Sequence, residues 1–204
     1  MLNYFGQLRV YSLLDLCILL IATQATTYEF LGVILLHVAF LAYLETRHNH
    51  SYRKKVPEYL WIILSLIGLV LYGHTEGILF ILCSYIYTLK TKKAFAGTSP
   101  ILRGLQCFFL VGGIIGYENR LTWIVLIIFT IRNLCGDLRD VEKDKKEGLK
   151  TLPVILGLNK GVTYIHLVAT FVTTFVWFQF TNLSLLFLIP ILLVQLMTYR
   201  LTPR

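Results

Sequence analysis

The sequence predicts an all-α fold, a polytopic bundle of transmembrane helices. Of the 204 residues, 56% are hydrophobic and only 15% are charged, and the mean hydropathy is +0.70. A water-soluble domain of this size is not so apolar. Apolar runs recur along the whole chain, so we expect a single integral membrane domain over residues 1–204. The basic residues lie between these runs, and their distribution therefore indicates membrane topology rather than nucleic-acid binding.

Eight apolar segments fit helices if each span needs about 17 to 25 residues. The predicted ranges are 10–27, 29–46, 57–74, 75–89, 101–117, 119–136, 161–179 and 182–199. The first segment follows only Arg9 and has no small-residue cleavage site, so we expect a retained span rather than a signal peptide. The fourth segment is short, because the turn that precedes it is tight.

The basic residues predict the orientation of the bundle. They gather in the loops after the second, fourth and sixth segments. These residues are Arg47, Arg53, Lys54, Lys55, Lys90, Lys92, Lys93, Arg139, Lys143, Lys145, Lys146 and Lys150. The intervening loops offer only Arg120. Cytoplasmic loops carry the excess of Lys and Arg, so these three loops and both termini are predicted to be cytoplasmic. In a prokaryote the protein would span the inner or plasma membrane several times.

Carboxylates gather where the sixth segment ends. Asn133, Asp137, Asp140 and Asp144 fall within an arc of about 60° if one helix continues through them. Like charges at this spacing repel unless a cation lies among them. Magnesium suits the position, because it commonly joins one or two carboxylates to substrate phosphate oxygens. The alternative is a solvated helix end, in which basic residues three and four positions away neutralise the acids.

The stretch from Asn133 to Gly157 resembles the second aspartate-rich motif of the UbiA superfamily of intramembrane prenyltransferases. The residues that carry the resemblance are Asp137, Asp140, Asp144, Gly148, Thr151, Leu152, Pro153 and Gly157. Arg9 opens the first helix as a family arginine does. Tyr85 with Lys90 is similar to the family tyrosine and lysine that end the fourth helix.

The resemblance implies helices around a central cavity, Mg²⁺ as cofactor, and prenyl transfer from an isoprenoid diphosphate to a lipophilic or aromatic acceptor. The implied catalytic residues are Asp137, Asp140, Asp144 and Lys90. The implied metal ligands are the three aspartates and Glu45. The implied substrate-binding residues are Arg9, Glu45, Asn49, Arg53, Tyr85, Lys92, Asn133 and Arg139. Candidates for the cavity wall are Tyr85, Tyr87, Phe108 and Phe109.

The first aspartate-rich motif of the family is altered in this chain. Leu41 replaces an asparagine, and only Glu45 and Asn49 remain in register. The family usually has nine helices, against eight predicted ranges here. These departures leave open a silent or cyclase-like homologue that binds polyprenyl lipid. A small transporter is a third hypothesis, although the spans hold few polar residues. Among these is Asp15, for which we expect a buried hydroxyl or arginine partner.

Overall fold

The computed structural model describes residues 10–47, 56–89, 96–158 and 162–200. Eight helices in this part of the chain have thirteen or more residues. They are α2 (Val10–Ala22), α3 (Thr27–Arg47), α4 (Glu58–Tyr72), α5 (Glu76–Thr88), α6 (Ser99–Ile115), α7 (Arg120–Arg139), α10 (Val162–Phe180) and α11 (Leu188–Arg200). The short elements are the 3-10 helices η2 (Ala96–Thr98) and η3 (Leu185–Phe187) and the α-helices α8 (Val141–Lys146) and α9 (Leu152–Ile155).

The all-α prediction is confirmed for the described residues, and each of the eight predicted ranges overlaps one of the long helices. Two of these helices have the length and composition of a membrane span. They are α3, over Thr27–Thr46, and α7, over Arg120–Arg139. The number of spans and the cytoplasmic placement of the termini remain predictions.

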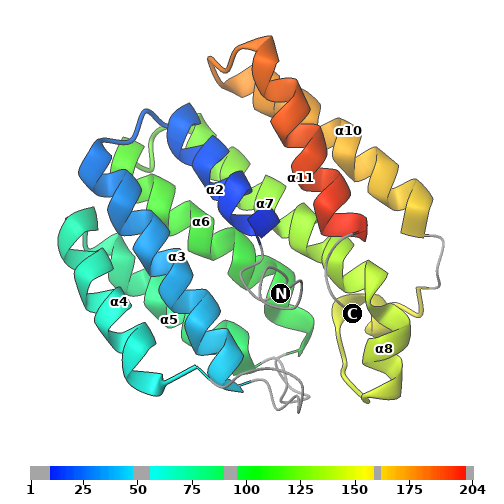
Figure 1. The fold of residues 1–204 in the computed structure, drawn as a ribbon. Helices are drawn as coiled ribbons and strands as arrows, with labels where there is room; N and C mark the ends of the chain where they lie inside the picture. The colour runs from blue at the N-terminus through cyan, green and yellow to red at the C-terminus, as the bar shows by residue number, and fades with distance from the viewer. Residues whose placement is uncertain (1–9, 48–55, 90–95, 159–161, 201–204) are drawn as a thin grey trace.

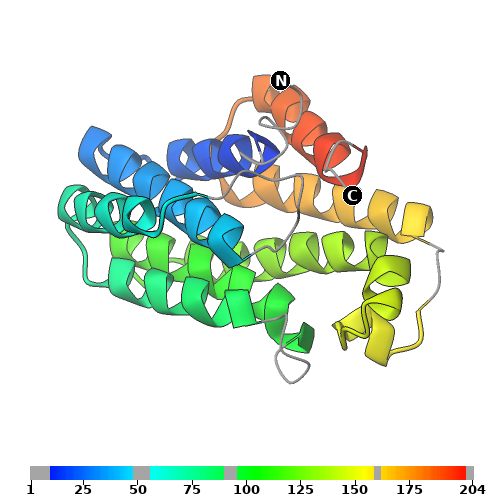
Figure 2. The same cartoon turned by 60° about the horizontal axis from the view of Figure 1, so that its bottom comes forward.

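Six of the long helices form a ring. Each contacts the next in the order α2, α3, α5, α6, α7 and α11, and α11 contacts α2 to close the ring. Helix α4 lies outside the ring on α3, and α10 packs on α7 and α11 (Figure 1). The short helices α8 and α9 lie beyond the end of α7, and α9 also contacts η2 (Figure 2). The segments that end α7 and begin α6 are therefore neighbours.

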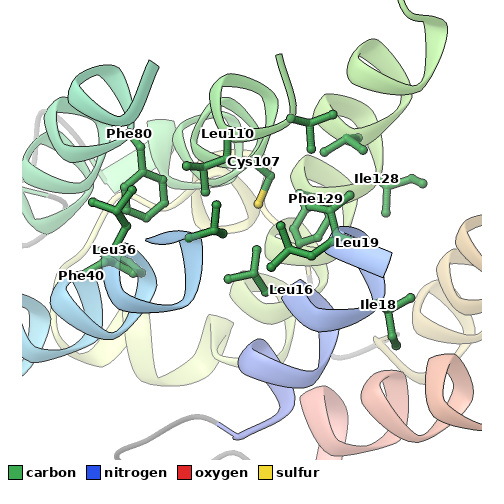
Figure 3. Packing of buried hydrophobic residues seen from close by; sticks show 14 of the residues in the cluster. Leu16, Ile18, Leu19, Leu36, Phe40, Phe80, Cys107, Leu110, Ile128 and Phe129 are labelled. Carbon is green, nitrogen blue, oxygen red and sulfur yellow. The ribbon is translucent and has the colours of Figure 1, made fainter. Parts of the chain in front are cut away.

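Buried apolar side chains from five helices of the ring belong to one cluster, and Ile18 lies on the side of α2 toward α10 and α11 (Figure 3). The labelled residues are Leu16, Ile18, Leu19, Leu36, Phe40, Phe80, Cys107, Leu110, Ile128 and Phe129. Helix α7 also buries two charged side chains, those of Arg132 and Asp137.

Two pairs of helices approach closely through glycine. A Cβ atom at Gly32 of α3 would overlap the backbone nitrogen of Tyr72 in α4. A Cβ atom at Gly104 of α6 would overlap Oγ1 of Thr130 in α7. Small residues let helix backbones come this close. Helices α6 and α7 are therefore in close backbone contact beside Arg103, whose own side chain reaches Ser12 of α2 and Phe40 of α3.

Candidate active site

One end of the ring brings together the end of α7 and the start of α6. Ser99, the first residue of α6, donates a hydrogen bond from Oγ to Oδ2 of Asp137, at 2.7 Å. Ser99 is fully buried and Asp137 is 5% exposed. Burial of a carboxylate is costly unless hydrogen-bond donors compensate it. The Ser99 hydroxyl supplies one such donor and fixes the orientation of the carboxylate.

The predicted continuous helix face through the acids is wrong. Helix α7 ends at Arg139, Asp140 takes φ −92° and ψ 5°, and α8 begins at Val141. The 100° rule requires one uninterrupted helix, so it cannot place Asp144 relative to Asp137. The described residues contain no group of three or more His, Cys, Asp or Glu side chains that could hold a metal ion. The predicted convergence of three carboxylates is therefore not found.

Asp140 lies at the break and binds its neighbour. The guanidinium of Arg139 donates from Nε to Oδ1 of Asp140, at 2.9 Å, and from Nη2 to Oδ2, at 2.6 Å. Such a two-bond contact is strong and geometrically specific. Asp140 is the most exposed of the three aspartates, with 32% of its side chain accessible against 10% for Arg139.

Asp144 is held by the turn that follows it. Gly148 has φ +66°, its N–H donates to the carbonyl of Lys145, and the N–H of Leu149 donates to the carbonyl of Asp144. This is the Schellman arrangement that ends a helix, and its left-handed residue is usually glycine. The turn brings Thr151 back, and its Oγ1 donates to Oδ2 of Asp144 at 3.0 Å. Gly148 and Thr151, which carried the family resemblance, thus support Asp144.

Asn133 and Tyr87 lie below the acids on the inner side of the ring. The Tyr87 hydroxyl donates to Oδ1 of Asn133 at 3.4 Å, and Tyr87 is 5% exposed. Nδ2 of Asn133 is buried and has no hydrogen-bond partner in the described part of the chain. A buried amide without an acceptor is costly, so this atom is a candidate donor to substrate.

Tyr85 does not line the interior as predicted. It is 49% exposed and stacks on Tyr43, with ring centroids 6.3 Å apart. Residues two apart on a helix point in nearly opposite directions. Since Tyr87 faces inward, Tyr85 faces outward. The other predicted wall residues, Phe108 and Phe109, contact each other, and Phe108, in the middle of α6, also packs on Trp123 in the first turn of α7.

Glu45 is the predicted ligand from the other half of the site. It lies in the last turn of α3 and is 7% exposed. The remaining predicted site residues lie outside the described residues. They are Arg9, Asn49, Arg53, Lys90 and Lys92.

Sequence reasoning missed a buried basic group one helical turn deeper in the ring. Arg132 of α7 forms an ion pair with Asp15 of α2, which is the arginine partner expected for Asp15. Arg103 of α6 donates from Nη1 to Gln106 Oε1, at 2.8 Å, and from Nη2 to Ser12 Oγ, at 3.1 Å. The signal in the sequence was an arginine inside an apolar helix, a position that usually marks a functional site.

Comparison with known proteins gives a family. The model of the UbiA prenyltransferase family matches residues 59–202. Digeranylgeranylglyceryl phosphate synthase of Methanosphaera stadtmanae is 30% identical over 154 residues, which cover 68% of this chain and 56% of that protein. The synthase of Pyrococcus abyssi is 29% identical over 135 residues, 60% of this chain and 49% of the relative.

The synthase of Methanobrevibacter smithii is 37% identical over 84 residues, 38% of this chain and 29% of the relative. The chain spans about half the length of the first two of these relatives and less of the third. No solved structure matches it. Because the family match covers most of the chain, including α7, α8 and α9, the chain belongs to the UbiA prenyltransferase family.

Proposed function

We propose that this chain transfers a prenyl group from an isoprenoid diphosphate to a lipophilic acceptor, at the membrane face that carries its basic loops. One observation carries the proposal. Asp137 and Asp144 are buried carboxylates, and each accepts a hydrogen bond from a hydroxyl of another segment, Ser99 or Thr151. Family membership supplies the reaction class. These two acids would bind the diphosphate through a metal ion that they hold.

The residues fit a magnesium ion that is bound together with substrate. Mg²⁺ takes oxygen ligands, and it is usually held by one or two carboxylates plus phosphate oxygens rather than by an all-protein cage. Asp137 and Asp144 would hold it, with hydroxyl donors that orient each carboxylate as outer-shell partners do. When bound, the ion neutralises the negative charge that develops on the departing diphosphate.

The chain's own residues would bind the diphosphate and shield the prenyl group. Arg139 lies next to the acids. If its guanidinium turned from Asp140 to the diphosphate, it could form two hydrogen bonds to phosphate oxygens in place of the two that it forms to Asp140. Tyr87 packs edge-on against Phe40, with ring centroids 5.5 Å apart. Aromatic faces stabilise an allylic cation, which forms when the carbon–oxygen bond to the diphosphate breaks. The further residues proposed for diphosphate binding are Arg9, Glu45, Asn49, Arg53, Lys90 and Lys92.

The names of the relatives suggest the acceptor. Their product carries two geranylgeranyl chains on glyceryl phosphate, and removal of one chain leaves a glyceryl phosphate lipid with a free hydroxyl. We propose this class of acceptor for the present chain, with geranylgeranyl diphosphate as donor. The acceptor hydroxyl would attack the allylic carbon, form the ether bond and lose its proton, while diphosphate leaves.

The altered α3 segment favours a second candidate, a homologue that binds polyprenyl lipid without transferring it. Leu41 lies one turn before Glu45 and cannot ligate a metal. This candidate predicts that isoprenoid co-purifies with the protein and is not consumed. A cyclase would instead release diphosphate in the absence of any acceptor.

Diphosphate release separates these possibilities. The chain would be purified in detergent and incubated with Mg²⁺, geranylgeranyl diphosphate and a monoalkylglyceryl phosphate. We expect acceptor-dependent release of diphosphate, its loss in Asp137→Asn, and its retention in the control Glu142→Gln, an exposed acid of α8. Equal turnover by wild type and Asp137→Asn would contradict the proposal, as would no turnover by wild type across a panel of acceptors.

A further inference from the structure

The buried basic group forms a distinct layer of the ring, which we call the basic layer and define as Arg103, Arg132, Asp15, Gln106 and Ser12. Arg103 lies four residues after Ser99, and Arg132 lies five residues before Asp137. At 1.5 Å per residue, the basic layer is about 6 to 7.5 Å below the Ser99–Asp137 contact along the helix axes. The ring thus carries acids at its end and cations one turn deeper.

The basic layer holds a surplus positive charge. Arg132 forms an ion pair with Asp15, and Arg103 lies within the electrostatic reach of the same carboxylate. Among the described residues, the printed partners of the Arg103 guanidinium are neutral, namely Gln106, Ser12 and the Phe40 ring, 5.6 Å from its guanidinium carbon. Arg103 is 9% exposed and Arg132 is 8% exposed. Two buried cations therefore share one carboxylate, and a buried charge that is not fully neutralised is expensive, especially at membrane depth. The surplus charge therefore suggests an anion that is supplied by a ligand.

The two guanidiniums also have unused hydrogen-bond donors. An arginine has five N–H groups, so the pair has ten. Within the described part of the chain, three of these have acceptors, which are Gln106, Ser12 and Asp15. The remaining donors suit a phosphate, because guanidinium binds phosphate oxygens in pairs.

A chain of contacts connects the basic layer to the acids. The Phe40 ring lies under Arg103 and packs edge-on against Tyr87, whose hydroxyl donates to Asn133. Asn133 lies on α7 between Arg132 and the acids, and its Nδ2 has no acceptor among the described residues. Nδ2 of Asn133 could therefore donate a hydrogen bond to a ligand that extends from the basic layer toward the acids.

We propose that the basic layer binds the anionic headgroup of the acceptor, a phosphate monoester, and that Arg103 selects anionic over neutral acceptors. This inference rests on the proposed function for the identity of the lipid. The spacing agrees with it, because the hydroxyl that is prenylated in a glyceryl phosphate lies only a few bonds from the phosphorus. The donor diphosphate would occupy the acid end with its metal, so the two anions would bind at different depths.

Direct binding tests this assignment without turnover. Isothermal titration would compare a monoalkylglyceryl phosphate with the matching monoalkylglycerol, in detergent and without donor or Mg²⁺. We expect wild type to bind the phosphate on the order of tenfold more tightly or better, since charge-assisted hydrogen bonds are strong. Arg103→Met should remove this preference. Arg120→Met, the same change at the opposite end of the ring, should leave it unchanged.

Arg103→Lys provides a second variant in case Arg103→Met does not fold. It keeps the charge and loses the paired geometry, so it should retain part of the preference. In turnover assays Arg103→Met should raise the acceptor KM on the order of tenfold and leave the donor KM unchanged. A purely structural role for Arg103 would not separate the two KM values.

Three outcomes would overturn the assignment: equal binding of phosphate and alcohol by wild type, an unchanged preference in folded Arg103→Met, or a rise in the donor KM in place of the acceptor KM. If wild type prefers the phosphate but never releases diphosphate, the anion site stands and the proposed transferase activity falls. If diphosphate is released but wild type does not prefer the phosphate over the alcohol, the proposed transferase activity stands and the anion site falls.

Discussion

The two halves of the proposed diphosphate site are built differently. In the α7–α8 half, two buried carboxylates receive hydroxyl donors from separate segments, Ser99 and Thr151. In the α3 half, the described residues offer one carboxylate, Glu45, inside an uninterrupted helix. The difference shows that the acids of an aspartate-rich motif are not sufficient, because other residues of the motif position the carboxylates. Gly148 and Thr151 of the motif form the turn after α8 that positions the Asp144 carboxylate.

The largest effect should come from the acids of the stronger half. Asp137→Asn should lower kcat/KM on the order of 10²–10³-fold, because it removes one charged ligand of the leaving group's counter-ion. Glu45→Gln should have a smaller effect, on the order of tenfold. Steady-state assays of diphosphate release would measure both. Equal losses would show that the two halves contribute alike and would contradict the comparison.

The supporting hydroxyls should come next. Ser99→Ala and Thr151→Val remove the donors to Asp137 and Asp144, and loss of an outer-shell partner costs about 10–100-fold in metal affinity. Activity titrated against Mg²⁺ would therefore shift to higher concentration, with the maximum rate largely retained. Thr122→Val, which removes a hydroxyl that donates to Gly116 at the opposite end of the ring, is the matched control. An unchanged magnesium midpoint in both site variants would refute the supporting role.

The turn after α8 should show a smaller, purely conformational effect. Gly148→Ala places a Cβ on a residue with φ +66° and should destabilise the fold by about 1–2 kcal/mol. Thermal unfolding in detergent would measure it, with exposed Glu147→Ala as control. Because the same turn brings Thr151 to Asp144, the magnesium midpoint of Gly148→Ala should move in the direction of Thr151→Val. A loss of stability without a shift in the magnesium midpoint would show that the turn does not position Asp144 for metal binding.

The smallest effect should come from the opposite end of the ring. There His74 Nε2 lies 2.8 Å from Oε1 of Glu29, and the pair is partly exposed. His74→Gln should change the free energy of unfolding by about 0.2–1 kcal/mol and leave turnover unaltered. A large loss of turnover would show that the two ends of the ring are coupled.

The sequence predicted the long helices well, because each apolar run is close to the length of a helix and polar turns separate the runs. Helical spacing singled out Asp137 and Asp144 as candidate site residues, and the resemblance to the family motif singled out Gly148 and Thr151. It could not locate the break at Asp140, since neither proline nor glycine marks that junction. This miss is one of local conformation and not of composition.

Other features depended on contacts between distant segments. Which of Tyr85 and Tyr87 faces inward is decided by how α5 packs against α3 and α6. The surplus positive charge of the basic layer follows from a long-range contact, the ion pair between Arg132 and Asp15, which are 117 positions apart. Single-helix periodicity contains no information about such partners.

The close contact at Gly32 has a consequence for biogenesis. In a lipid bilayer, helices do not associate through the hydrophobic effect, and close backbone packing at small residues takes its place. Helices α3 and α4 are consecutive in synthesis and have this contact, so they can associate as a hairpin before α6 and α7 leave the ribosome. We expect a bulky residue at position 32 to impair membrane assembly early, at a stage when the helices that carry the acids are not yet present.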